Sequence, residues 1–167
     1  MNKNKITKYS TPEGFSVSMA IIDLIPVLFF GLSSVKVGLI FQSRLFIFGS
    51  LICLISGIIK VLWKLLAALL KKNKWWMFVQ MRILMPIGFL TIIAALFINR
   101  AKLSLSVIIS ILTGFPSCIF FIIGAIGMIT MLIFAFILDS SDPKVNWAEQ
   151  TVNSVAQISF FIGLTLI

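Results

Sequence analysis

Six polar side chains lie inside long apolar stretches of the sequence, where lipid would penalise them. They are one carboxylate, three bases and two amides: Asp23, Lys60, Lys64, Arg82, Asn153 and Gln157. Inserting an Asp, Lys or Arg at the centre of a membrane helix costs about 2.5–3.5 kcal/mol, so such residues usually face the interior of a helix bundle and find partners there. Because the bases outnumber the acid, all six are candidate ligand-binding residues for a small polar or anionic solute.

The spacing of these residues supports one common site. Lys60 and Lys64 are four residues apart with Ser56 a turn earlier, so the three side chains share one helix face. Asn153 and Gln157 repeat the same spacing further along the chain. Counted from the expected helix ends at ~1.5 Å per residue, the charged members lie roughly 8–15 Å deep on the same side of the bilayer. We therefore expect a polar cavity in the cytoplasmic half of the membrane.

Each of these residues also has a purely structural interpretation. Lys64 and Arg82 are near enough to the interface for their long side chains to reach the headgroups. Asp23 and Lys60 could form an ion pair that only holds two helices together. The amides of the last helix, with Glu149 on the same face, could hydrogen-bond neighbouring helices.

Other kinds of chemistry are not indicated. The sequence has no His, and Cys53 and Cys118 lie in separate apolar stretches, so we predict no metal site and no cofactor. No phosphate-binding loop, dinucleotide fingerprint or nucleophile elbow is present, and we predict no catalytic residues. A lipid-active enzyme using Asp139, Asp142 or Glu149 is a less favoured alternative. The net charge of +9 comes largely from basic residues at the expected membrane edges, so nucleic acid is not an expected partner.

The elements that must position the six residues are transmembrane helices. Apolar residues make up 60% of the chain and charged residues 11%, against about 45–50% and 25% in soluble domains. A helix needs about 20 apolar residues to cross the hydrocarbon core. We predict a single all-α polytopic integral membrane domain over residues 1–167. Its five transmembrane helices are expected at residues 15–35, 45–70, 77–98, 116–138 and 146–166.

Local signals set these boundaries. The motif Ser10-Thr11-Pro12-Glu13 is typical of a helix start, and the break at residues 139–143 has the same character. The pair Trp75-Trp76 follows a run of lysines, as expected at the headgroup level. Gly114-Phe115-Pro116 divides a stretch too long for one crossing. We expect residues 103–113 to form a short interfacial or re-entrant helix, with one long helix kinked at Pro116 as the alternative.

Orientation follows from the basic residues of the short loops. With the N-terminus inside, seven lysines fall on cytoplasmic segments and four Lys or Arg residues fall outside, which favours a cytoplasmic N-terminus. No cleavable signal peptide is evident, because the first apolar stretch is long and interrupted by Asp23. The Lys, Asn and Ile usage is typical of a bacterial protein. We predict a multi-pass protein of the cell inner (plasma) membrane.

These observations lead to a functional hypothesis. We predict a small membrane transporter, or a membrane-embedded binding subunit, for a small polar or anionic solute. At 167 residues the chain is small for a complete transporter, so we expect a homo-oligomer or a partner membrane protein besides the lipid bilayer. The alternative is an accessory or assembly subunit of a larger membrane complex, with Gly49, Cys53 and Gly57 as a small-residue packing face.

Overall fold

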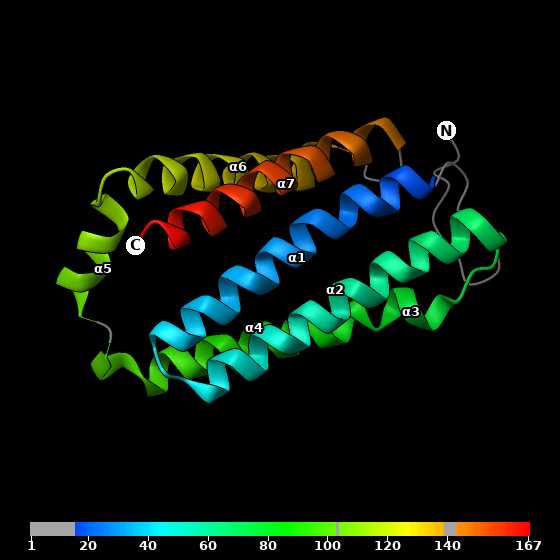
Figure 1. The fold of residues 1–167 in the computed structure, drawn as a ribbon. Coiled ribbons are helices and arrows are strands. Elements are labelled where there is room, and N and C mark those ends of the chain that lie inside the picture. Colours follow the sequence, from blue (N-terminus) through cyan, green and yellow to red (C-terminus); the bar gives the residue numbers. More distant parts are fainter. Residues whose placement is uncertain (1–15, 103, 139–142) are drawn as a thin grey trace.

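The computed structural model describes residues 16–102, 104–138 and 143–167, and within these ranges it contains helices and no strands (Figure 1). In chain order the elements are α1 (Val17–Ile40), α2 (Arg44–Leu70), α3 (Trp75–Val79), α4 (Met81–Ile98), the 3-10 helix η1 (Arg100–Lys102), α5 (Leu105–Thr113), α6 (Ser117–Ile137) and α7 (Pro143–Thr165). The predicted all-helical fold is thus confirmed for the described part of the chain. The predicted helix start at residues 10–13 and the break at 139–142 lie outside the described residues.

The long helices form a curved row. α4 packs on α2, α2 on α1, α1 on α7, and α7 on α6. Among the described residues, α4 and α6, at the two ends of this row, have no close backbone approach to each other. α5 crosses one end of the row and leads from η1 to α6 (Figure 1). The start of α1, the end of α2 and the start of α7 meet at the opposite end, which positions the polar residues described below.

Small residues allow neighbouring helices to come close. A Cβ added at Gly49 of α2 would lie 2.9 Å from the carbonyl oxygen of Gly88 in α4, so the two backbones are in contact there. Gly57 accommodates a side chain from α1 on another face of α2, and Gly124 of α6 accommodates the ring of Phe160 in α7. The predicted small-residue face of the second helix is therefore a packing surface between helices of the same chain.

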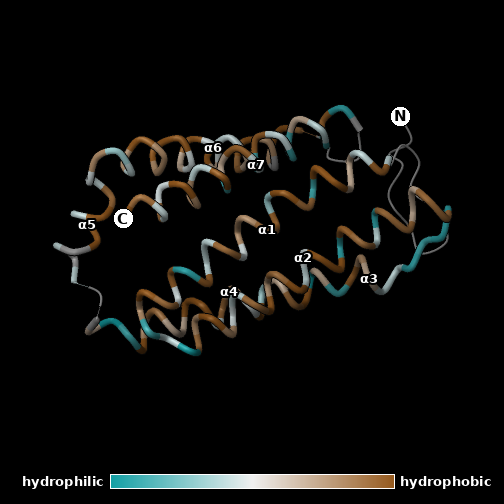
Figure 2. Tube along the Cα trace, in the orientation of Figure 1, coloured by the Kyte–Doolittle hydropathy of each residue, from teal (hydrophilic) through white to brown (hydrophobic). Residues whose placement is uncertain are grey.

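Four helical segments are long and apolar enough to cross a membrane: α1, α2, Trp75–Ile98 and residues Ser117–Phe134 of α6. The third segment combines α3 and α4, which meet at Gln80 with helical backbone angles. The predicted count of five spans is not confirmed, because α7 is 23 residues long but is not among the segments that qualify by composition. Figure 2 shows the reason: α6 is apolar nearly throughout, whereas polar positions interrupt α7.

Two boundaries differ from the expectation. α1 continues to Ile40 instead of ending near residue 35, and it begins at the N-cap Ser16, whose hydroxyl accepts a hydrogen bond from the Met19 amide. α5 and α6 are separate helices, with α5 running steeply across the row (Figure 1), so the alternative of one long kinked helix is wrong. The break falls at Gly114–Pro116, where Pro116 lacks the amide hydrogen that would continue the helix.

Candidate functional site

An ion pair between α1 and α2 forms the centre of the site. The Nζ atom of Lys64 lies 2.8 Å from Oδ2 of Asp23, and the two side chains are only 3% and 4% exposed. Asp23 is six residues from the start of α1 and Lys64 six from the end of α2, which places both about 9 Å inside the helix ends at ~1.5 Å per residue.

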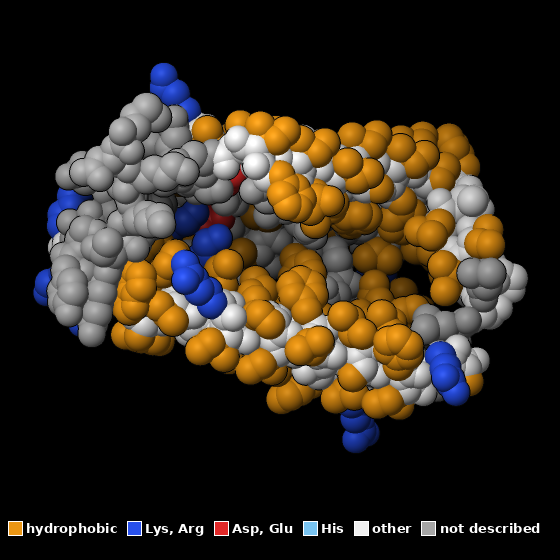
Figure 3. All heavy atoms as spheres, turned by 180° about the vertical axis from the view of Figure 1, so that it is seen from behind, with side chains coloured by type: hydrophobic (Ala, Val, Ile, Leu, Met, Phe, Trp, Pro, Cys, Tyr) orange, Lys and Arg blue, Asp and Glu red, His pale blue; other side chains and the backbone are white. Residues whose placement is uncertain are grey.

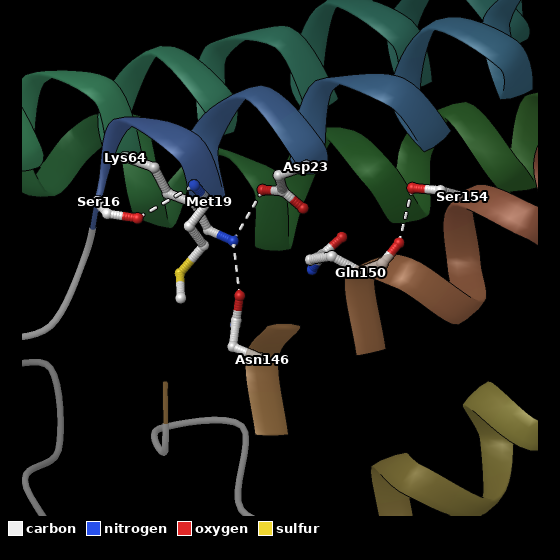
Figure 4. A network of polar contacts seen from close by, with 7 residues as sticks. All are labelled: Ser16, Met19, Asp23, Lys64, Asn146, Gln150 and Ser154. Atoms are coloured by element: carbon white, nitrogen blue, oxygen red, sulfur yellow. Dashed lines mark hydrogen bonds and ion pairs between the residues drawn. The ribbon is translucent and has the colours of Figure 1, made fainter. Parts of the chain in front are cut away.

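α7 completes the surroundings of this pair (Figure 4). Lys64 also donates a hydrogen bond of 3.4 Å to Oδ1 of Asn146, in the first turn of α7. The next turn brings Gln150, whose side chain is directed toward Asp23 and Lys64. Gln150 is 7% exposed, and its Oε1 atom has no hydrogen-bond partner among the described residues. The buried Glu149 is also near enough to act electrostatically on Lys64.

Lys60 extends the site along α2. It lies one turn before Lys64 on the same face, is half-buried, and is near enough to act on the Lys64 charge. One turn earlier, Ser56 donates a 3.2 Å hydrogen bond to Oε1 of Gln80, whose Nε2 donates to the Ser56 carbonyl oxygen at 3.1 Å. This face of α2 therefore turns toward α4 at Ser56 and toward α1 and α7 at Lys64, with Lys60 between. We call Asp23, Lys60, Lys64, Asn146 and Gln150 the polar cluster.

Three of the candidates predicted from the sequence lie elsewhere or at the margin. Arg82 is exposed, and its guanidinium lies over the ring of Phe78 at 5.3 Å from the centroid. Gln157 is buried but turns to α6, where its Nε2 donates to the sulfur of Met128 at 3.4 Å. Asn153 is half-buried on α7, about one turn beyond Gln150. The structure thus brings together Asp23 and Lys64, with Lys60 adjacent, and leaves the other three outside.

Two expectations about individual residues are corrected. Lys64 does not reach the interface, because its ammonium group is turned inward and held by Asp23. The base that pairs with Asp23 is Lys64, whereas the sequence suggested Lys60 for that role. Lys60 and Lys64 share a helix face, so only the relative stagger of α1 and α2 decides which of them lies opposite the carboxylate.

Three polar partners were missed. Asn146 is the first residue of the predicted helix at residues 146–166, where a polar side chain is typical of a helix end. Gln150 follows Glu149 directly and lies off the helix face that Glu149 shares with Asn153 and Gln157. Gln80 lies where α3 meets α4, close to the start of the predicted helix at residues 77–98. Their signal in the sequence is weak, because amides near helix ends are common in the headgroup region, and only tertiary packing buries Asn146 and Gln150 and brings Gln80 onto Ser56.

No family model, curated protein or solved structure matches the chain. Function must therefore be inferred from the geometry of the polar cluster. Within the part of the chain that the structure describes, no group of three or more Cys, Asp or Glu residues could hold a metal ion. The chemistry that the cluster offers is recognition by charge and hydrogen bonds, through two ammonium groups, a carboxylate and two amides contributed by three helices.

Proposed function

We propose that this protein is a small transporter, or a membrane-embedded binding subunit, for a small polar or anionic solute that binds at the polar cluster. The observation that carries the proposal is a buried amide with an unmatched acceptor, Gln150, next to a buried ion pair. A buried polar group without a partner destabilises a protein by about 1–3 kcal/mol. A ligand that donates a hydrogen bond to Oε1 of Gln150 would remove this cost.

The preference for an anion follows from the charge balance. Asp23 and Lys64 neutralise each other, and the buried Glu149 also acts electrostatically on Lys64. Lys60 is the base of the cluster for which no ion pair is seen among the described residues. Polar and ionisable groups inside a membrane usually mark a ligand or ion pathway. A carboxylate or phosphate of the solute would complement Lys60, while a hydroxyl or amine would complete the hydrogen bonding of Gln150.

In this proposal α7 is a fifth crossing helix. Its polar residues Asn146, Glu149 and Gln150 are buried against the neighbouring helices. The mean hydropathy of α7 is therefore lower than the hydropathy of the face that would contact lipid. The chain would then span the cell inner membrane with a cytoplasmic N-terminus, and the polar cluster would lie in the cytoplasmic half. The small size of the chain favours action as a homo-oligomer or with a partner membrane protein.

A ligand-induced thermal shift on the purified full-length chain tests the proposal. The panel should contain small carboxylates and phosphates, with and without hydroxyl groups, together with their uncharged analogues. Stabilisation follows RT ln(1 + [L]/Kd), so an anion at about 100 times its Kd adds about 2.7 kcal/mol. We expect Lys60→Met to abolish this shift and Lys36→Met to retain it. Both lysines are half-buried, but Lys36 lies near the opposite end of the row.

The result that overturns the proposal is equally specific. If no anion stabilises the wild-type protein, and Lys60→Met is as stable as the wild type, the cluster has no detectable affinity for anions. A transport role is then tested separately by uptake of the best ligand into proteoliposomes. Binding without uptake identifies a binding subunit.

The second candidate is the accessory or assembly subunit, which one observation favours. The helix row is not closed, since α4 and α6 do not approach each other among the described residues, and much of their apolar surface is exposed. A membrane protein that co-purifies stoichiometrically and covers α4 or α6 would support this candidate. Solute uptake by the protein alone would oppose it. The acids Asp139 and Asp142 of the lipid-active alternative lie outside the described residues.

A further inference from the structure

The structure has a hollow on one side of the helix row. Figure 3 shows it between the α4 side and the α6 side of the molecule, lined mostly by hydrophobic side chains, with acidic and basic side chains gathered at one end. Its existence follows from the packing order, because α1, α2 and α7 lie between α4 and α6, which do not meet among the described residues. We call it the lateral hollow.

The polar cluster lies at one end of the lateral hollow. The α2 face that carries Lys60 is bounded by the Ser56–Gln80 contact on the α4 side and by the Lys64–Asn146 contact on the α7 side. This face therefore turns toward the space between α4 and α7. Further along the row, Phe89 of α4 reaches toward Phe30 of α1, with ring centroids 6.0 Å apart, yet remains 46% exposed. The surface changes from charged to apolar along the row.

We propose that the lateral hollow binds a single anionic lipid with a hydroxylated headgroup. Its phosphate would face Lys60, a headgroup hydroxyl would bond Gln150, and one acyl chain would lie along the hollow between α4 and α6. This inference rests on the proposed function, because it names the ligand class of the same polar cluster. The inference goes beyond the proposed function in one respect, because the ligand must also carry an apolar chain.

Two observations favour a lipid over a free solute, and a third favours a hydroxyl on its headgroup. The cluster lies about 9 Å from the helix ends at ~1.5 Å per residue, a depth that a lipid headgroup reaches with a modest displacement from its leaflet. The polar-to-apolar order of the surface matches the head-to-tail order of a lipid. A hydroxyl can either donate or accept, so it satisfies the Gln150 amide in either orientation of its oxygen and nitrogen.

Lipid retention measured by native mass spectrometry tests the proposal on the full-length chain. The protein is released from bilayer nanodiscs that contain equal amounts of phosphatidylglycerol and phosphatidylcholine with the same acyl chains. The first lipid is anionic and hydroxylated, whereas the second has neither property. We expect one phosphatidylglycerol per chain, preferred at least tenfold. A charge-assisted hydrogen bond contributes about 1.5–3 kcal/mol, or roughly a tenfold to hundredfold change in affinity.

Matched variants and a soluble probe separate the possible results. Lys60→Met should remove the preference, Gln150→Leu should weaken it several-fold, and Lys36→Met should retain it. Glycerol phosphate, which has the head without the chains, should give a thermal shift that Lys60→Met removes, but with an affinity at least tenfold weaker than that of the lipid.

Each opposing result has a distinct meaning. If glycerol phosphate binds as well as the lipid, the hollow has no role and the inference fails, while the proposed function stands. If neither binds, both fail. Equal retention of phosphatidylglycerol by Lys60→Met would show non-specific charge attraction and overturn the inference. Release as a dimer without lipid would do the same, because a second copy would then cover the hollow.

Discussion

Replacing Lys64 by Met should destabilise the protein strongly, because it leaves the Asp23 carboxylate buried without its base. Removing one member of a buried ion pair typically costs about 3–5 kcal/mol. The pair here is at the upper end of that range, since both side chains are at most 4% exposed and water cannot screen the charge that remains. We expect a loss of about 4–5 kcal/mol for Lys64→Met.

The reverse replacement should be milder. After Asp23→Leu, the Lys64 ammonium keeps its hydrogen bond to Asn146 and stays within electrostatic range of Glu149. We expect a loss near 3 kcal/mol. Replacing both residues, with Asp23→Leu and Lys64→Met, removes both desolvation penalties and should be nearly neutral, within about 1 kcal/mol of wild type. The two sites should therefore be coupled by about 6 kcal/mol or more.

Reversible unfolding of the full-length protein in mixed detergent micelles, followed by far-UV circular dichroism, provides the three free energies. Asn153→Leu is a suitable control, because this half-buried amide on α7 lies outside the polar cluster. The reasoning is refuted if the double variant loses as much stability as the two single variants together. Such additivity would show that Asp23 and Lys64 do not stabilise each other.

Three further predictions concern the packing, the unmatched amide and the topology. Gly88→Ala should destabilise the protein by about 1–3 kcal/mol through overpacking, because the added Cβ would lie 2.9 Å from the carbonyl oxygen of Gly49. A stability equal to that of the wild type in the same micelles would contradict this. Gln150→Leu should raise the stability of the ligand-free protein by about 1 kcal/mol or more, because it removes a buried acceptor that has no partner; a loss of stability would indicate that the amide is satisfied. Single cysteines introduced at Lys72 and at Ile167, in a variant without the native cysteines, should be labelled from opposite sides of the membrane if α7 crosses it. Labelling of both positions from the same side would exclude five crossings.

The sequence was sufficient for the helices, because long apolar stretches report the environment directly. The bounds of α2 and α6 follow the predicted ones within one or two residues, since basic residues, Pro116 and the break near residue 139 mark their ends. The count of crossings was less secure. α7 has polar side chains that tertiary packing buries, and composition alone cannot distinguish a helix that is polar toward its neighbours from one that is polar toward water.

The site could be predicted only in part. Placing Asp23 opposite a lysine of the second helix required only their similar depths, which the residue count supplies. Choosing Lys64 over Lys60 requires the stagger of α1 against α2, which depends on how Gly57 and Val27 fit together. Arg82 was grouped with the others by depth alone, yet it lies on another face of its helix, over Phe78. Depth can be read from one sequence, but rotation about the helix axis depends on packing.

Ligand binding by the double variant Lys60→Met with Gln150→Leu, which removes both proposed ligand contacts, is the decisive measurement. It asks whether the polar cluster binds a ligand or only holds α1 and α2 together through a structural ion pair. This variant keeps the fold in our account, so binding and stability can be measured on the same sample. We expect this variant to have a free energy of unfolding close to or above that of the wild type and an affinity at least tenfold weaker for the anionic ligand that stabilises the wild type. Wild-type affinity in a folded double variant would contradict the account, and the ion pair would then be structural.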